Sequence, residues 1–426
     1  MEILNTTNTI SLLFERVKDK QEEIHRWLDS HEGAKDLPLY SSVDIRDAGF
    51  KVSVVDTNIF PAGFNNLCEH GLKDSESLIR TAINKRAANC KDILIIAEEH
   101  TRNAWYLENI RILQQIIERA GFRVRIATFL NVQPAFYETA KCIELETATG
   151  ALVKIYCVRK VLEEFQAGRE RIDLIILNND LTTGIPEILK NSSVPVYPSL
   201  QAGWHSRSKR RHFDYTRDLI CEFARILEVD PWLVSCLHNV ADKVDINVES
   251  DRQKLMDSAS DLFNRIRVKY QEHRIGEKPY IFVKADSGTY GMGVLPIEDP
   301  HDIMTLNHRN RNKLHMGKNG QLIDRYLLQE GVPTIYNIDQ EVSEVCIYQI
   351  ENNLVGGFYR SHISKGQRDN LNSQGMVFKK MCPHLSKYGD CGVHHDINIF
   401  DFYRILARIA GIAAHREIIQ LEATLK

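Results

Sequence analysis

Apolar and polar positions alternate in blocks along the first half of the chain, and these blocks predict units of strand, loop and helix. A continuous apolar run at 92–97 precedes a polar loop, a stretch with helical spacing at 105–120 and a second apolar run at 122–129. The pattern recurs with apolar runs at 172–177 and 194–198. Continuous apolar runs joined by helices are typical of parallel strands that are buried on both faces. We therefore expect an α/β domain with a parallel sheet.

Polar residues follow two of these runs, at the carboxyl ends of the expected strands. They lie at 98–103 and 178–180, and open α/β sheets bind their ligands at this edge. Apolar residues at helical spacing within 9–30 predict an amphipathic helix. The segment 199–212 marks a boundary, after which we expect a long helical region at 214–271.

The second half begins with a predicted strand, a glycine loop and a second strand within 280–295. Lys284 ends the first apolar run, and Gly288, Gly291 and Gly293 give the spacing GxxGxG. A phosphate cradle requires backbone N–H groups, glycines that permit close approach and a nearby cation. The spacing differs from that of Walker and Rossmann loops. A glycine-rich hairpin with a surface lysine stays open as the alternative.

The rest of the chain predicts an α+β domain. An apolar run within 321–332 ends at the polar pair Gln329 and Glu330, and 341–360 has the pattern of an antiparallel hairpin. An asparagine-containing segment at 370–375 follows, and a last helix is expected at 397–414.

Two charged segments are candidate binding sites. The stretch 40–67 places charged and amide side chains beside a short strand, which favours a binding loop over turn residues that cap their own backbone. The basic cluster 204–212 leaves three interpretations open. They are a solvated loop, a nucleic-acid patch, and arginine and lysine side chains that face carboxylates or phosphates.

Composition narrows the class of protein. The chain has 426 residues, of which 43% are hydrophobic and 26% charged, enough for two or three packed domains. Its formal net charge of −3 gives no general reason to bind nucleic acid or a membrane surface. Nine cysteines without a CxxC pair fit reduced thiols, and the N-terminus lacks the pattern of a signal peptide. We expect a cytoplasmic protein that acts on small molecules, and a homo-oligomer stays open.

These features together resemble the ATP-grasp fold, in which two α+β lobes hold ATP between them. Lys284, the glycine loop, Gln329 with Glu330, Arg360 and the segment 370–375 follow the order found in glutathione synthetases. The run 39–67, which contains DIRDAGFK and FPAGFNNL, is similar to the signature of proteobacterial glutamate–cysteine ligases of the ATP-grasp type. The resemblance implies a pre-ATP-grasp-like α/β substrate domain at 1–205 and an ATP-grasp domain at 206–426, with a flap at 284–294.

The resemblance also implies a reaction. The γ-carboxylate of L-glutamate would attack ATP to give an acyl phosphate, and the amine of L-cysteine would open it to γ-glutamylcysteine, ADP and phosphate. This is the first step of glutathione biosynthesis, with Mg²⁺ as the cofactor of ATP. Phosphoryl transfer depends on positioning and charge neutralisation, so Lys284 and Arg360 are the expected catalytic residues. Replacing either is expected to reduce turnover and to leave the fold intact.

The resemblance implies the following site residues. ATP would be bound by Lys284, Ser287, Gly288, Thr289, Gly291, Gly293, Gln329 and Glu330. Mg²⁺ would be held by Glu344 and Asn372, with Glu341 behind them. The amino-acid substrates would be bound among Asp44, Arg46, Asp56, Asn65, Asn66, Arg102 and Arg207.

Other interpretations stay open. Many ATP-grasp enzymes carry an acidic residue and then Glu-x-Asn near the C-terminus as metal ligands, whereas this chain has the imperfect Glu422-Ala-Thr424. The alternatives are an ATP-dependent carboxylate–amine ligase with another acceptor, and a nucleotide-binding regulatory protein without catalysis. A zinc site is also conceivable, although its residues lack the paired spacing of strong zinc motifs. These residues are Cys382, His384, Cys391, His394 and His395.

Overall fold

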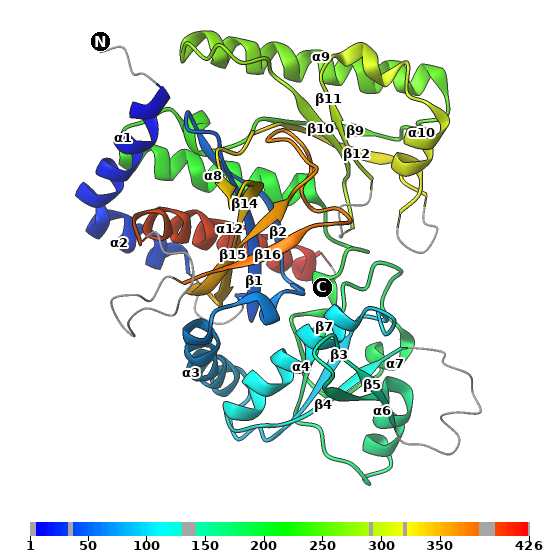
Figure 1. The fold of residues 1–426 in the computed structure, drawn as a ribbon. Coiled ribbons are helices and arrows are strands. Elements are labelled where there is room, and N and C mark those ends of the chain that lie inside the picture. The colour runs from blue at the N-terminus through cyan, green and yellow to red at the C-terminus, as the bar shows by residue number, and fades with distance from the viewer. Residues whose placement is uncertain are drawn as a thin grey trace.

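The computed structural model describes residues 6–32, 37–129, 142–288, 293–317, 322–382 and 397–424. The described strands form three sheets, which lie one after another along the molecule (Figure 1). Among the described residues, no helix combines the length and apolar character needed to cross a membrane.

The first sheet confirms the predicted parallel α/β unit. Its strand order is β5-β6-β4-β3-β7-β8, and every pair is parallel except β5 with β6. The strands are β3 (Asp92–Ala97), β4 (Arg123–Thr128), β5 (Cys142–Glu146), β6 (Leu152–Cys157), β7 (Leu174–Asn178) and β8 (Val196–Tyr197). The helices of this part are α3 (Glu69–Arg86), α4 (Ala104–Arg119), α6 (Val158–Gln166) and α7 (Glu187–Lys190), and short 3-10 turns lie at η1 (Phe64–Asn66) and η2 (Leu200–Ala202). β3 and β7 are buried almost throughout, as their continuous apolar runs require.

The second sheet contains the two strands predicted on either side of the glycine loop, of which residues 289–292 lie outside the described residues. Its order is β11-β10-β12-β9, and all pairs are antiparallel. The strands are β9 (His238–Asp242), β10 (Ile281–Ala285), β11 (Val294–Ile297) and β12 (Arg325–Glu330). Helices α9 (Glu249–Glu272) and α10 (His308–His315) and the turn η4 (Pro300–Ile303) belong to this part. In Figure 1, α9 lies across the top of this sheet.

The third sheet pairs strands from the N-terminal part of the chain with strands from its C-terminal part. Its order is β16-β15-β14-β1-β2, with β13 paired to β14 at the side. The strands are β1 (Tyr40–Asp47), β2 (Val52–Asn58), β13 (Asn337–Ile338), β14 (Glu341–Ile350), β15 (Asn353–His362) and β16 (Val377–Met381). The division into domains at residue 205 stays a prediction, but β1 and β2 share a sheet with strands that follow residue 336.

Four helices pack beside this third sheet, in an apolar core that also includes α9 and residues of the second sheet. They are α1 (Thr6–Asp19), α2 (Gln21–His31), α8 (Lys209–Leu227) and α12 (Ile397–Ala423). The single helix predicted over 9–30 is divided between α1 and α2. The long helical region predicted over 214–271 was wrong, because α8 ends where Glu228 adopts a left-handed backbone with φ +55°. The turn η3 (Pro231–Val234) and strand β9 then precede α9.

Candidate active site

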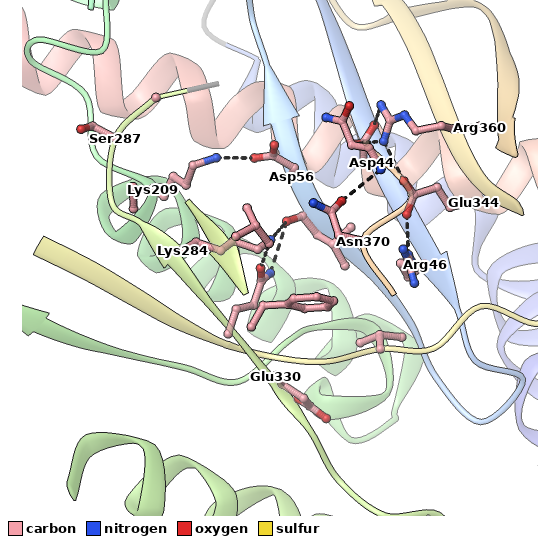
Figure 2. Close-up of a pocket in the computed structure, with 18 residues that line it drawn as sticks. Asp44, Arg46, Asp56, Lys209, Lys284, Ser287, Glu330, Glu344, Arg360 and Asn370 are labelled. Carbon is pink, nitrogen blue, oxygen red and sulfur yellow. Dashed lines mark hydrogen bonds and ion pairs between the residues drawn. The ribbon is translucent and has the colours of Figure 1, made fainter. Parts of the chain in front are cut away.

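A pocket of about 710 Å³, partly open to solvent, lies where the second and third sheets meet the start of α8 (Figure 2). Strands β1 and β2 form one wall, and β10 and β12 form another. Eleven of the residues predicted from the sequence line it. They are Asp44, Arg46, Asp56, Lys284, Ser287, Gly288, Gln329, Glu330, Glu344, Arg360 and Asn372.

A chain of four alternating charges forms the side of the pocket next to β14 and β15. Arg46 Nε lies 2.5 Å from Glu344 Oε2, and Arg360 Nη1 lies 2.7 Å from Glu344 Oε1. Arg360 also contacts Asp44, with Nη1 2.8 Å from Oδ2 and Nη2 3.2 Å from Oδ1. Glu344 and Arg360 meet because they are directly paired residues of β14 and β15. The four side chains are therefore held in place by the register of one sheet.

Burial and these contacts shift the pKa values of Glu344 and Asp44 in opposite directions. Burial raises the pKa of Glu344, but the guanidinium groups of Arg46 and Arg360 together outweigh it, and the pKa is lowered. Burial raises the pKa of Asp44, Arg360 opposes this, and the neighbouring carboxylates of Glu344 and Asp56 add to it. Both oxygens of Glu344 are therefore occupied by arginines.

Arg46 also fixes the loop that brings asparagines to the pocket. Its guanidinium donates hydrogen bonds to the backbone oxygens of Gln367, at 3.0 Å, and Asp369, at 2.8 Å. Asn370 and Asn372, which follow directly, line the pocket. Sequence analysis placed Arg46 among the substrate ligands, whereas its described contacts are to Glu344 and this loop.

Lys284 is a cation of the opposite wall that forms no ion pair within the described residues. Its ammonium donates hydrogen bonds to the Val55 backbone oxygen at 3.2 Å and to Gln329 Oε1 at 2.5 Å. Among the described residues no carboxylate lies within ion-pair distance of it. Burial lowers the pKa of Lys284 to about 8, against the attraction of Asp56 and with a smaller lowering from Lys209. A buried cation of this kind is poorly compensated until an anion binds beside it.

The sequence analysis missed Lys209, the first residue of α8. Its ammonium lies 3.1 Å from Asp56 Oδ1, and the residue lines the pocket. Burial raises the pKa of Asp56, but Lys209 and then Lys284 outweigh this effect and the pKa is lowered. The basic cluster 204–212 was the only signal, and it does not say which cation faces the pocket.

Several predicted residues lie elsewhere. Arg207 forms a buried ion pair with Glu417, with Nε 2.9 Å from Oε2. Glu341 Oε2 lies 2.8 Å from Lys379 Nζ at the start of β14. The remaining residues are Asn65 and Asn66 in η1, Arg102 in the turn before α4, and Gly293 before β11. None of these six residues is part of the pocket lining, and Thr289 and Gly291 lie outside the described residues.

The Glu330 carboxylate is bound by other groups of the protein. Its Oε1 lies 2.9 Å from Lys51 Nζ, and it accepts hydrogen bonds from Trp232 Nε1 at 3.0 Å and from the Leu237 N–H at 2.9 Å. The side chain is completely buried. The Glu330 carboxylate and its backbone N–H, which donates to the Leu237 backbone oxygen at 2.8 Å, therefore already have protein partners.

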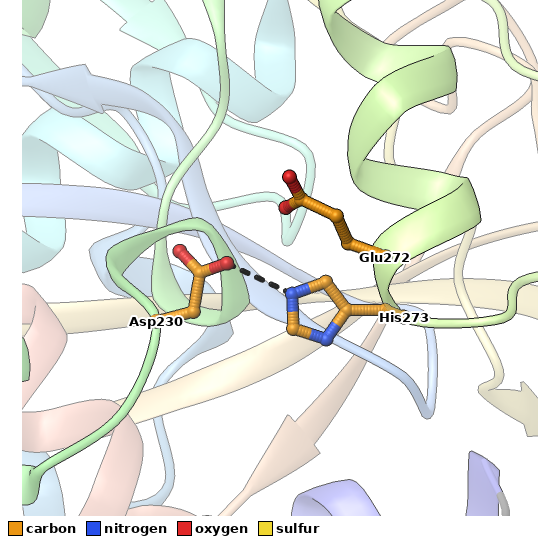
Figure 3. A group of neighbouring side chains, drawn as sticks. All are labelled: Asp230, Glu272 and His273. Atoms are coloured by element: carbon orange, nitrogen blue, oxygen red, sulfur yellow. Dashed lines mark hydrogen bonds and ion pairs between the residues drawn. The ribbon is translucent and has the colours of Figure 1, made fainter.

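Neither the predicted zinc ligands nor a second cluster of acidic and histidine side chains gives support for a metal site. Of the proposed zinc ligands only Cys382 lies within the described residues, where its sulfur is 3.6 Å from His70 Nδ1. A different group, Asp230, Glu272 and His273, lies close together between η3 and the end of α9 (Figure 3). Lys269 Nζ lies 2.9 Å from Asp230 and 2.8 Å from Glu272. Because Lys269 bridges the two acids and His273 Nε2 lies 2.8 Å from Asp230, the contacts of this cluster are explained without a metal ion.

Comparison with solved structures gives a strong similarity to one of the proteins described here. The crystal structure at 1.90 Å of a protein named as a gamma-glutamylcysteine synthetase, from Methylobacillus flagellatus KT, is 32% identical, with a TM-score of 0.84 and 98% of each chain covered. D-alanyl-alanine synthetase A from Vibrio cholerae is 12% identical, with 65% of this chain and 68% of that chain covered and a TM-score of 0.30. A glutathione synthetase-like effector from Globodera pallida is 11% identical, with 84% and 78% covered and a TM-score of 0.35. The last two similarities are too low to carry an argument.

Comparison of the sequence gives the family. No curated protein sequence matches the chain. The family model described as glutamate-cysteine ligase (GshA) matches residues 15–418, nearly the whole chain. With the similarity to the Methylobacillus protein, this match identifies an enzyme that joins amino acids and confirms the resemblance drawn from 39–67. The chain belongs to the glutamate–cysteine ligase family.

Proposed function

We propose that the protein uses ATP to join the γ-carboxylate of L-glutamate to the amine of L-cysteine, giving γ-glutamylcysteine, ADP and phosphate. The family match supports the ligase reaction. The observation that carries ATP use is Lys284, a buried ammonium without a described acidic partner, in the same pocket as Arg360. A buried ammonium that forms no described ion pair suits a phosphate group.

The pocket offers different surroundings to the two ends of ATP. Phe282 and Val332 give an apolar surface beside the end of β12, where a purine ring would lie. Lys284 would bind the phosphates, together with the backbone at Ser287 and Gly288. Gly288 has φ +102°, a conformation that side chains disfavour and that lets backbone N–H groups turn toward an anion.

The reaction would proceed in two steps. The glutamate γ-carboxylate attacks the γ-phosphorus of ATP, so that a carboxylate–phosphorus bond forms and the bond to ADP breaks. The cysteine amine then attacks the acyl carbon, loses a proton and displaces phosphate. Arg360 would stabilise charge on the transferring group, since its Nε is buried and has no hydrogen-bond partner. Excluding water protects the acyl phosphate from hydrolysis.

Mg²⁺ does not fit the ligand set predicted from the sequence. Glu344 is occupied by two arginines, and Glu341 pairs with Lys379 away from the pocket. Asp56 fits better, because it lines the pocket and pairs with Lys209 through one oxygen; Asp44, its direct partner on β1, also lines the pocket and would have to share its oxygens with Arg360. Carboxylate oxygens are the ligands that Mg²⁺ prefers, and the ion would neutralise phosphate charge there.

The order of these residues supports the choice. Asp44 is followed by Asp56-Thr57-Asn58, an acidic residue and then acid-x-Asn, which is the pattern expected near the C-terminus and incomplete at Glu422. Alternate residues of a strand share a face, so Asn58 follows Asp56 on the same side of β2. The third sheet brings this N-terminal hairpin beside the C-terminal strands. We therefore propose that the ligand pattern lies at the beginning of the chain.

We also propose that the reaction takes place in the cytoplasm and that the chain divides into two domains at residue 205. The eight cysteines within the described residues are free thiols, as expected in a reducing cytoplasm. Residues 1–205 would contribute mainly the amino-acid side and 206–426 the nucleotide side.

The test is ADP and phosphate release with glutamate, with and without cysteine, together with mass detection of γ-glutamylcysteine. Other amines in place of cysteine distinguish a ligase with another acceptor. ATP binding without turnover in any amino-acid mixture would indicate a regulatory protein and would overturn the proposal.

Lys284→Ala provides the test of the site. It should lower kcat/KM by about 10²- to 10³-fold, the loss typical of removing one charge-stabilising donor. Lys313→Ala is the matched control, because Lys313 lies outside the pocket lining and its ammonium donates a hydrogen bond to the Val294 backbone oxygen. Equal activity of the two variants would remove Lys284 from the mechanism.

A further inference from the structure

We infer that Lys209, the residue of the segment 204–212 that lines the pocket, binds the α-carboxylate of the glutamate substrate. The inference rests on the proposed function and names a part of the pocket that the sequence comparison leaves unassigned. It concerns an amino-acid carboxylate, and not the phosphates of ATP.

Lys209 is a second pocket cation, separate from Lys284. Its side chain is 11% exposed, and the pocket is where its ammonium meets solvent. The ammonium lies 3.1 Å from Asp56 Oδ1 and 5.2 Å from the centre of the Trp204 ring. Lys209 and Lys284 both lower the pKa of Asp56, and Lys209 forms the ion pair with it. A metal ion at Asp56 would leave the Lys209 ammonium available to a second carboxylate.

The position of Lys209 favours the amino acid. The apolar surface for a purine lies at Phe282 and Val332, near the end of β12. In Figure 2, Lys209 and the β12 residue Glu330 lie on opposite sides of Lys284. A nucleotide that starts at β12 and passes Lys284 with its phosphates would place its γ-phosphate, and hence the amino acid, toward Lys209.

The segment before Lys209 connects the pocket with the parallel sheet. The Trp204 N–H donates a hydrogen bond to the Asp180 backbone oxygen at 2.8 Å, and His205 Nδ1 lies 3.1 Å from the Leu181 backbone oxygen. Asp180 and Leu181 follow directly after the carboxyl end of β7. This edge is where sheets of this type bind ligands, so Lys209 lies on the pocket wall that faces the substrate side of the molecule.

The same segment holds buried polar atoms without a hydrogen-bond partner. They are Trp204 Nε1, His205 Nε2, Arg207 Nη2 and both ring nitrogens of His212. Trp204 is 5% exposed, Arg207 2% and His212 3%. Buried polar groups are nearly always hydrogen-bonded, so such a concentration indicates a polar ligand or ordered water that belongs there. His212 interacts electrostatically with Asp56 and Lys209, which places it close to the pocket.

At the start of α8 the Lys209 side chain, and not a backbone N–H group, would bind an anion. The Lys209 N–H donates to the Asp286 backbone oxygen at 2.7 Å, and the Arg210 N–H donates to Asp286 Oδ1 at 2.8 Å. The Ser208 N–H donates to Glu417 Oε1, and the Arg211 N–H to Ser208 Oγ. These N–H groups already have protein partners, so the helix N-terminus itself offers none of them to a ligand. Asp286 also fixes Lys209 relative to Lys284, two residues before it.

The test is Lys209→Met in the full-length enzyme, with two measurements. The KM for glutamate should rise roughly 10- to 100-fold, as expected for a lost charge-assisted hydrogen bond. The Kd for ATP, titrated without amino acids, should stay within about twofold, because Lys284 is unchanged. Arg210→Met is the matched control, since its side chain is 51% exposed and pairs with Asp242 outside the pocket.

The outcomes separate the inference from the proposed function. A weaker ATP affinity with an unchanged KM for glutamate would overturn the assignment and make Lys209 a phosphate ligand. If Lys209→Met does not fold, Lys209→Gln provides the same readout while keeping a donor for Asp56. If the wild type binds glutamate without forming γ-glutamylcysteine, the proposed function fails. Glutamate titration of the variants then still decides the role of Lys209.

Discussion

The Lys51 ammonium lies 2.9 Å from the Glu330 carboxylate, and the two side chains are 1% and 0% exposed. Lys51 also lies over the Trp232 ring, 4.1 Å from its centre, and Trp232 Nε1 donates to the same carboxylate. Lys51 stands in the turn between β1 and β2, and Glu330 ends β12. The ion pair therefore connects the hairpin of Asp44 and Asp56 to the strand that borders the nucleotide side of the pocket.

Lys51→Met should lower the free energy of unfolding by about 3–5 kcal/mol, because it leaves the Glu330 carboxylate as an uncompensated buried charge. Denaturant unfolding at neutral pH measures the change. The control is Lys85→Met, since Lys85 is 38% exposed and lies 3.8 Å from Glu351. That variant should lose less than about 1 kcal/mol. Similar losses in both variants would show that the buried pair has no special role in stability.

Lys284 should make ATP binding depend on pH. Burial lowers the pKa of Lys284 from 10.5 to about 8. Only the ammonium form attracts phosphate, so the Kd for ATP should rise about tenfold per pH unit above 8. Without ATP the sign for stability is opposite. Between pH 8 and 10.5 the unfolded chain holds a proton that the folded protein has lost, so the contribution of Lys284 to stability increases with pH.

Lys284→Arg separates this effect from other titrations. Arginine stays charged throughout the range, so its Kd for ATP should be nearly constant between pH 8 and 9.5 even where its absolute affinity differs. Calorimetric titration of both proteins at several pH values gives the comparison. The same slope in wild type and variant would assign the pH dependence to another group.

Arg360→Ala should reduce both turnover and stability. The sequence alone predicts an intact fold, but the structure places Arg360 between Asp44 and Glu344, all with side chains no more than 15% exposed. Removing the guanidinium leaves two buried carboxylates close together, at a cost of about 3–5 kcal/mol. Thermal and denaturant unfolding measure it, with Arg217→Ala as the control because Arg217 is 53% exposed. A stable but inactive Arg360→Ala protein would contradict this account.

The strands that could be predicted are those whose burial leaves a hydrophobic pattern in the local sequence. The apolar run at 92–97 became β3, and the strand that ends near Lys284 became β10, because burial on both faces leaves a visible hydrophobic signature. The interruption of 214–271 was missed, since β9 is short and its partner β12 lies far along the chain. The pairing of β1 with β14 depends on contacts between residues about 300 positions apart, which no local pattern records.

The same limit applies to the pocket. The residue types of the site could be listed, but their partners could not. Glu344 looked like a free metal ligand until two arginines were found beside it, and Arg207 was selected from a basic cluster in which Lys209 faces the pocket. Tertiary contacts decide which of several similar side chains is occupied and which is available.

The metal ligands predicted from the sequence differ from those proposed from the structure, and a metal-binding measurement distinguishes the two sets. Asp56→Asn should weaken binding of Mn²⁺, used as a paramagnetic stand-in for Mg²⁺, to the ATP complex by roughly 10- to 100-fold. Glu341→Gln should leave it unchanged, because Glu341 pairs with Lys379 and lies outside the pocket lining. The amide keeps the size of the side chain and removes the charge that a hard cation requires. Electron paramagnetic resonance of the bound Mn²⁺ measures affinity without relying on turnover.

Asp44→Asn is the second arm, and it separates a metal ligand from a partner of Arg360. Asp44 contacts Arg360 through both oxygens, so its loss should lower stability as well as Mn²⁺ affinity. Within the described residues Asp56 forms an ion pair with Lys209 alone, and its side chain is 38% exposed, so Asp56→Asn should affect Mn²⁺ affinity with a smaller loss of stability. If Glu341→Gln weakened Mn²⁺ binding and Asp56→Asn did not, the ligands would have to be sought at the start of β14. The hairpin β1–β2 would then serve the amino acid alone.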